Sequence, residues 1–164
     1  MESNYKIGDK IIDFVSIYQI TSIDTKNKDV ILYYRPIKGT EKVFTASIPE
    51  KNLDKANLRK LISSSEIKEI LSDLKKPLKN YEYNIRQIKE EIYLNIPQKN
   101  IIHLKHLYEN ENTLQNNEDK KIREELINHL CLEISFVTQK PLIFTRKKIE
   151  KILRNKQKIP QVGD

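Results

Sequence analysis

Apolar and polar residues in the first fifty positions follow the short period that is typical of β-strands. Four segments rich in Ile, Val, Tyr, Phe and Thr lie at residues 5–12, 16–23, 30–36 and 42–48, with polar turn sequences between them. In the last segment, residues 43, 45 and 47 alternate with residues 44, 46 and 48, which predicts one buried and one exposed face. We therefore expect a small, strongly bent antiparallel sheet or partial barrel.

From residue 63 onward the apolar positions recur with the period of an α-helix. Ser63 followed by Glu66 forms a capping box, in which the hydroxyl accepts from a backbone N–H and the carboxylate reaches back to the cap. Apolar side chains then return at spacings of three and four residues, at Ile67, Ile70, Leu71 and Leu74. Because Pro77 ends the pattern, the sequence predicts an amphipathic helix of about three turns.

Helical patterns continue from Pro77 almost to the end of the chain. Pro97 lies where a first-turn proline belongs, and Thr145 is expected to cap the last helix. The apolar stripes are Tyr81, Ile85, Ile88 and Ile92; Ile101, Leu104 and Tyr108; Ile122, Leu126, Leu130, Ile134 and Val137; and Ile149, Ile152 and Leu153. We predict a compact bundle of about five helices.

These two patterns predict an α+β protein with two domains. The β domain is expected at residues 1–52 and the helical domain at residues 53–158, followed by a flexible tail at residues 159–164.

Composition favours a globular protein of the cytoplasm. Of 164 residues, 38% are hydrophobic and 32% are charged. No apolar run approaches the roughly 20 residues that span a bilayer, and the N-terminus lacks the apolar segment of a signal peptide. Cys131, the one cysteine, leaves no internal disulfide and is expected to be a small, inert, buried residue.

Charge is distributed unevenly between the two predicted domains. Residues 1–50 hold seven Lys or Arg against seven Asp or Glu, so residues 51–164 hold 23 against 16 and carry the whole net charge of +7. Attraction to phosphates scales with the cations available. The helical part is therefore the candidate for a polyanion, and the neutral β part is better suited to a protein partner.

Few residues suggest catalysis or metal binding. His103 and His106 are three apart on one helical face, but no Cys, Asp or Glu nearby completes a zinc set, so we interpret them as surface histidines. The glycines are isolated, which excludes a phosphate-binding glycine loop. The serines near residue 63 are explained by capping. We expect no catalysis, no metal and no cofactor.

A family resemblance joins these elements. Ile48-Pro49 at the end of a strand, then Asn52, then Leu58-Arg59, then the capped helix after Ser63, resembles the CarD/CdnL family of bacterial transcription regulators. The opening strand, with Gly8-Asp9-Lys10-Ile11-Ile12, is similar to that of the same family. The resemblance implies a Tudor-like or SH3-like N-terminal barrel, related to the RNA-polymerase-interacting domain of transcription-repair coupling factors.

For the barrel, the resemblance implies binding to the RNA polymerase β subunit. Residues 13–16 lack the Gly- and Pro-containing turn of most members, and Ser47 stands near where several relatives have an arginine. Arg35 on the neighbouring strand is the candidate substitute, although an exposed strand arginine is often merely solvated. We name Arg35, Ser47 and Lys42 as polymerase-binding residues.

For the helical domain, the resemblance implies contact with promoter DNA. The family's tryptophan, which wedges into the minor groove at the upstream edge of the bubble, corresponds to Tyr81, with Tyr83 as the substitute candidate. Tyr81 also lies on an apolar stripe, so a core position is the alternative. The cations expected to hold phosphates are Lys79, Arg86, Lys89, Lys120 and Lys121. The later basic run at 146–158 is interpreted as an ordinary solvated helix face.

The leading hypothesis is thus a monomeric, non-enzymatic adaptor that reaches the nucleoid through RNA polymerase and stabilises the open promoter complex. Its own affinity for double-stranded DNA should be weak and independent of sequence. A stand-alone nucleic-acid-binding regulator is the alternative. A hydrolase or transferase is disfavoured, because no nucleophile, base and orienting group can be assembled.

Overall fold

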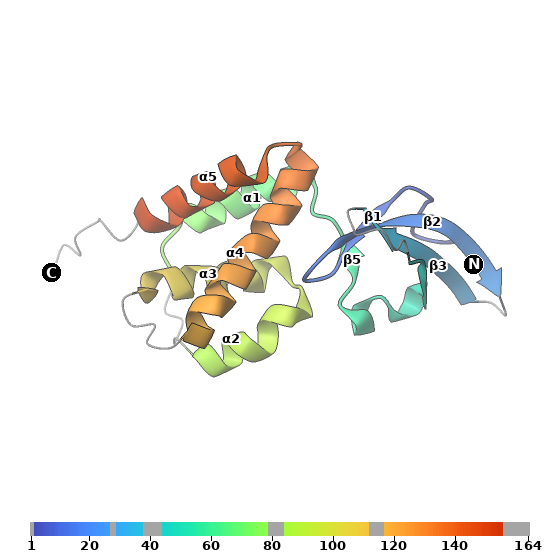
Figure 1. Ribbon diagram of the computed structural model, residues 1–164, viewed down its shortest axis with the longest axis horizontal. Helices are drawn as coiled ribbons and strands as arrows, with labels where there is room; N and C mark the ends of the chain where they lie inside the picture. Colours follow the sequence, from blue (N-terminus) through green and yellow to red (C-terminus); the bar gives the residue numbers. More distant parts are fainter. Residues whose placement is uncertain (1, 27–28, 38–43, 79–83, 112–116, 156–164) are drawn as a thin grey trace, which may run out of the picture. The chain divides into compact units, whose positions relative to one another are not determined.

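The chain folds into two compact units, Met1–Leu61 and Ile62–Asp164. The computed structural model describes residues 2–26, 29–37, 44–78, 84–111 and 117–155 (Figure 1). The first unit consists of strands and short 3₁₀ turns, and the second of helices. The expected α+β class is confirmed.

The first unit is a curled antiparallel sheet with the strand order β4-β3-β2-β1-β5. Its strands are β1 (Lys10–Ile12), β2 (Ile17–Lys26), β3 (Asp29–Pro36), β4 (Ala46–Pro49) and β5 (Arg59–Lys60). The pairing of β2 with β3 shifts register between Ile20 and Ser22. Such a bulge increases the local twist and helps a short sheet to curl into a half-barrel.

The concave side of this sheet encloses an apolar core. Its buried residues are Ile11, Ile20, Leu32, Leu53 and Leu58. The rings of Tyr18 and Tyr34 meet edge to face at its rim, with centroids 5.3 Å apart. Because Leu32 lies opposite Ile48 on β4, the same core fixes which face of β4 points outward.

Two expected strands are shorter than the sequence suggested. Gly8 has φ +96°, a left-handed conformation that interrupts an extended strand, so β1 begins only at Lys10. At the other end β4 begins at Ala46, and Phe44 is 57% exposed instead of sharing the inner side of Ala46 and Ile48. The alternation prediction therefore holds for Ala46, Ser47 and Ile48 and is wrong for Phe44.

The predicted domain boundary at residue 52 is also wrong. After β4 the chain forms two 3₁₀ turns, η1 (Glu50–Asn52) and η2 (Asp54–Ala56). Leu53 and Leu58 enter the core of the sheet, and β5 then pairs with β1. The segment 53–61 consequently belongs to the first unit, which ends at Leu61.

The second unit contains the helices α1 (Ser64–Lys75), α2 (Ile85–Glu91), α3 (Pro97–Glu109), α4 (Asn117–Thr138) and α5 (Leu142–Asn155), with the 3₁₀ turn η3 (Ile92–Leu94) after α2. Helices α1 and α5 lie side by side, and α4 runs across the bundle (Figure 1). Helix α3 contacts each of the other four helices, so it is the centre of the unit.

The helix ends partly follow the predictions. The capping box of α1 is confirmed, with Ser63 accepting from the N–H of Glu66 and the Glu66 carboxylate accepting from the N–H of Ser63. Pro97 occupies the first turn of α3 as expected. Helix α2 starts later than predicted, because Asn84 caps it. Thr145 is not a cap: α5 begins at Leu142, and Thr145 is buried within its first turn.

Buried polar side chains concentrate in the second unit. Among the described residues, the buried polar or charged side chains all lie there: Asn95, Asn100, His103, Lys105, His106, Asp119, His129, Glu133 and Thr145. The interpretation of His103 and His106 as surface residues is wrong, since they are 2% and 5% exposed. The central position of α3 leaves it no solvent face at these residues.

Candidate interaction surfaces

The outer face of the sheet brings together two of the predicted polymerase-binding residues. Ser47 on β4 lies directly opposite Tyr33 on β3, and Arg35 is two residues further along β3. Both Ser47 and Arg35 are exposed. Side chains two residues apart on a strand point to the same face, so Ser47, Tyr33 and Arg35 form one continuous surface. Lys42 lies outside the described residues.

Strand β4 is an edge strand. It pairs with β3 through residues 46–49, and no described strand pairs with its other side. An edge strand presents extended backbone donors and acceptors to which a further strand can pair. The surface of Ser47, Tyr33 and Arg35 lies beside this edge, so one partner can contact the backbone of β4 and these side chains together.

Hydrogen bonds hold the segment that follows β4. The Glu50 carboxylate accepts from the Ser3 hydroxyl at 2.6 Å and from the Asn4 backbone N–H at 3.0 Å. Partial burial acts to raise the pKa of Glu50, but these hydrogen bonds and the charge of Lys60 lower it on balance. Lys51 forms an ion pair of 2.7 Å with Asp29, the first residue of β3. The N-terminus and β3 thereby anchor the chain directly after the edge strand.

The loop between β1 and β2 is closed by an aspartate. The Asp13 carboxylate accepts from the N–H groups of Val15 and Ser16, at 2.7 and 2.6 Å. The Tyr18 hydroxyl donates to the same carboxylate at 2.6 Å. Burial and this hydrogen bond raise the pKa of Tyr18 to about 12. Asp13 therefore organises a turn that contains neither Gly nor Pro.

The predicted DNA-contacting cations fall into two groups. Arg86, Lys120 and Lys121 are exposed, although Arg86 lies 3.4 Å from Glu90 and Lys121 lies 3.7 Å from Glu125. Lys89 instead joins α2 to the start of α4, at 2.9 Å from Glu118 and 3.3 Å from Asp119. The Glu118 carboxylate raises the pKa of Lys89. Tyr81, Tyr83 and Lys79 lie outside the described residues.

Arg146, at the start of the later basic run, is also held by carboxylates. It donates to Glu124 on α4 and to Glu150 one turn further along α5, and it contacts Asn128. The Glu124 carboxylate raises the pKa of Arg146. Lys147 and Lys148, which follow it, are exposed. Arg146 therefore joins α5 to α4, while the lysines face solvent.

The observed boundary changes the charge argument. Residues 51–61 add Lys51, Lys55, Arg59 and Lys60 but only Asp54 to the first unit. Residues 1–61 then hold 11 Lys or Arg against 8 Asp or Glu, a net +3, and residues 62–164 hold 19 against 15, a net +4. The expectation of a neutral β domain is wrong, because positive charge is present in both units.

The buried polar residues of the second unit make internal contacts. Nε2 of His103 lies 3.1 Å from Glu91, which also lies 3.3 Å from Lys99. Burial lowers the pKa of His103 more than Glu91 raises it. The buried Glu133 carboxylate on α4 accepts from the backbone N–H of Ile62 at 2.8 Å. Sequence reasoning missed both contacts, since neither has a local pattern.

Groups suited to catalysis or metal binding are scarce in the described part of the chain. Cys131 is fully buried as expected, and burial raises its pKa to about 12, which suppresses the reactive thiolate. No cluster of three or more His, Cys, Asp or Glu with the geometry of a metal site occurs in those residues. None of their helices combines the length and apolar character that a bilayer crossing needs.

Comparison with known proteins adds no family assignment. No protein-family model matches the chain, and a search of curated proteins finds no match. The functional argument therefore depends on the chain's own residues and geometry.

Proposed function

We propose that this chain is a non-enzymatic transcription regulator of the CarD/CdnL type. Its first unit, a Tudor-like or SH3-like half-barrel, binds the β subunit of bacterial RNA polymerase. Its second unit contacts promoter DNA at the upstream edge of the bubble. The observation that carries the proposal is the edge strand β4, with the exposed Ser47 and Arg35 and the half-buried Tyr33 on one face beside it.

A partner strand fits this surface better than a small molecule does. The backbone of β4 supplies hydrogen bonds that do not depend on the partner's side chains. Arg35 adds a permanent positive charge that favours a carboxylate of the partner. Because the core holds Ile48 against Leu32, β4 is positioned before the partner arrives. Such preorganisation reduces the conformational entropy lost on binding.

The first experiment measures whether the purified chain co-elutes with RNA polymerase core. Arg35→Glu should weaken binding at least about tenfold, in the range expected for loss of a charged contact at an interface. Lys55→Glu is the matched control, because Lys55 is an exposed cation of the same unit that lies outside the sheet. Equal loss in both variants would show that net charge, and not the β4 surface, determines binding.

A gain-of-affinity variant provides a second check. The family resemblance implies an arginine near position 47, and Ser47 is exposed on the proposed surface. Ser47→Arg should therefore strengthen the interaction with polymerase. Ala56→Arg, which adds the same cation at an exposed position of η2 outside the sheet, should leave it unchanged.

The DNA contact is proposed for the second unit through Tyr81, Arg86, Lys120 and Lys121. Phosphate contacts by a few lysines and arginines give weak binding that decreases with salt and ignores sequence. The regulator stabilises the open complex only by the difference between its affinities for the open and closed forms. Tight, sequence-selective binding to DNA without polymerase, measured by fluorescence anisotropy, would contradict this proposal.

A second candidate is a stand-alone nucleic-acid-binding regulator in which both units grip the polyanion. It is favoured by the net charge of +3 on residues 1–61. Arg35→Glu separates the two candidates. Loss of polymerase binding with unchanged DNA affinity supports the adaptor, and loss of DNA affinity supports the stand-alone regulator.

A further inference from the structure

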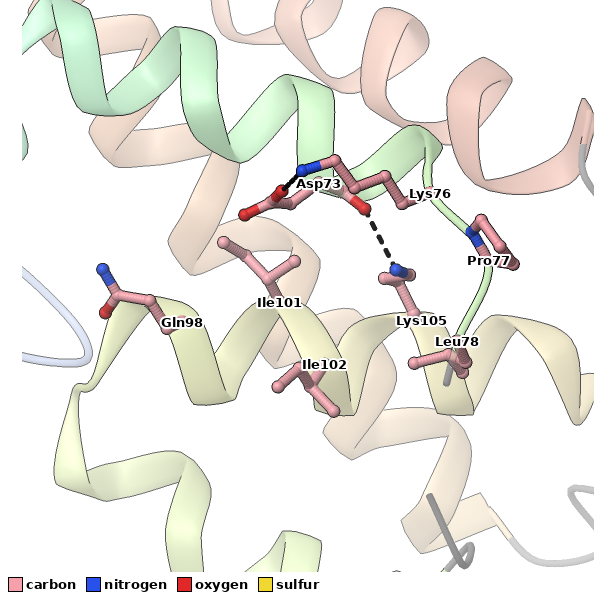
Figure 2. A pocket seen from close by; sticks show the side chains of 8 residues that line it. All are labelled: Asp73, Lys76, Pro77, Leu78, Gln98, Ile101, Ile102 and Lys105. Carbon is pink, nitrogen blue, oxygen red and sulfur yellow. Dashed lines mark hydrogen bonds and ion pairs between the residues drawn. The ribbon is translucent and has the colours of Figure 1, made fainter. Parts of the chain in front are cut away.

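A small pocket lies between the end of α1 and the first half of α3. Its volume is about 290 Å³. Figure 2 shows its apolar walls, which Pro77 and Leu78 form on one side and Ile101 and Ile102 on the other. Ligand pockets in proteins usually begin near about 300 Å³. The pocket is therefore suited to a small organic molecule and too small for a nucleotide.

Lys105 brings a buried positive charge to this pocket. The residue is 6% exposed, and its Nζ donates to the backbone oxygen of Asp73 at 3.0 Å (Figure 2). An ammonium group has three N–H donors, and Asp73 O is the one acceptor that the described residues give to this Nζ. The described residues thus leave two N–H donors of this largely buried lysine for a ligand.

Among the described residues, no carboxylate forms an ion pair with Lys105. The Asp73 carboxylate is paired with the ammonium of Lys76 at 2.6 Å, so these two charges balance each other. The carbonyl groups at the end of α1 give only partial negative charge to the site. A single anionic group beside Lys105 completes the balance, since buried charges are stable when paired and hydrogen-bonded.

Gln98 limits the length of ligand that the pocket accepts. It lines the pocket seven residues before Lys105 on α3, which corresponds to about 10 Å along the helix axis. Ile101 and Ile102 lie between them (Figure 2). A ligand with its anionic group at Lys105 therefore places its body on the two isoleucines before it meets the amide.

We propose that this pocket binds a small organic carboxylate with an apolar body, the carboxylate accepting from Nζ of Lys105 and the body packing on Ile101 and Ile102. This proposal does not rest on the proposed polymerase and DNA contacts. Phenylacetate has the required charge and size, and phenylacetamide is its neutral counterpart of nearly equal shape.

The test is an NMR titration of the full chain with each probe. Phenylacetate should shift the backbone amides of Leu78, Ile101 and Ile102 in a saturable manner in the millimolar range, as expected for a ligand of about ten heavy atoms. Phenylacetamide should bind at least about tenfold more weakly, because it lacks the charge. Equal binding of the two probes, or no saturable shift at about 10 mM, overturns the proposal.

Variants of Lys105 test whether its ammonium group binds the carboxylate of the probe. Lys105→Met should reduce phenylacetate affinity about tenfold or more, while Lys105→Arg retains most of it. Lys68→Met, which removes an exposed cation on α1, is the matched control and should leave the affinity unchanged. Unchanged affinity in Lys105→Met overturns the proposal. If Lys105→Met fails to fold, the comparison of the two probes on the unmodified chain decides the question alone.

Discussion

The two units stabilise their interiors in different ways. The described part of the first unit has an apolar interior beneath a short sheet, and its polar groups lie at the rim. The second unit buries histidines, a lysine and acidic side chains among its helices, several in direct contact, as in the pair of His103 and Glu91. The core of the sheet is therefore apolar, whereas the helical bundle also accommodates polar residues of its central helix α3.

The largest expected loss of stability comes from truncating a core residue in either unit. Leu32→Ala in the sheet and Leu107→Ala in α3 each remove a fully buried side chain, at a cost of about 2–5 kcal/mol. If the units are independent, Leu32→Ala lowers hydrogen-exchange protection of β3 amides and leaves α4 amides unchanged. Equal loss of protection in both units would show that they unfold as one.

A smaller loss of stability is expected when the buried carboxylate of Glu133 in the second unit is replaced. Glu133→Ala leaves the buried N–H of Ile62 without its acceptor, which costs about 1–3 kcal/mol. Glu133→Gln retains a carbonyl oxygen at the same place and should recover much of this loss. Urea unfolding of the three proteins, with the exchange rate of the Ile62 amide, provides the measurement. Similar destabilisation by both variants would indicate that the negative charge, and not the acceptor, matters.

The cap of α1 should contribute about 1 kcal/mol. Ser63→Ala removes the acceptor for the Glu66 N–H, while Ser64→Ala changes an exposed serine in the first turn and serves as control. The difference in thermal stability between the two variants measures the cap. No difference would mean that tertiary contacts hold the end of α1 without it.

Acid should weaken the second unit selectively. Burial lowers the pKa of His103 and of His106, so in acid the unfolded chain takes up protons before the folded one does. The two neutral histidines contribute fully to the free energy of unfolding above their ordinary pKa of about 6.5. This contribution is lost as the pH falls through their lower pKa values in the folded protein. NMR titration of the imidazole protons checks the direction, and midpoints above 6.5 would contradict it.

Alkali should weaken the first unit through Tyr18. Its pKa is raised to about 12 by burial and by the hydrogen bond to Asp13. The stabilising effect of the neutral phenol is complete below the unfolded pKa of about 10 and is lost as pH rises towards the folded value. Tyr18→Phe should reduce this alkaline loss of stability, measured as the unfolding free energy between these two pH values. The same pH dependence in Tyr18→Phe would assign the loss to other tyrosines.

Sequence predicted the features that short segments determine. The cap at Ser63 and the first-turn position of Pro97 depend on a few neighbouring residues. The burial of His103 and His106 does not depend on their neighbours in sequence. These two histidines are buried because α3 packs against the other helices. Strand β5 has only two residues, too few to show the alternation of apolar and polar residues. It forms because its backbone pairs with β1.

The candidate interaction surfaces could also be predicted only in part. Arg35 and Ser47 share one face because strand alternation and register place them there. The role of Lys89 was not visible, since its partners Glu118 and Asp119 are far along the chain. The predicted charge distribution was wrong because the domain boundary was wrong. The sequence analysis assigned residues 53–61 to the helical domain, whereas Leu53 and Leu58 lie in the core of the sheet.

The pairing of β5 with β1 also bears on how the protein emerges from the ribosome. Ile11 cannot meet its partner Lys60 until the whole of the first unit has left the exit tunnel, so the half-barrel closes late and over a long chain separation. Until then the edge of β1 lies open to other chains. If the ribosome pauses shortly before residue 60 emerges, β1 is therefore an edge of the sheet in place of the two-residue strand β5.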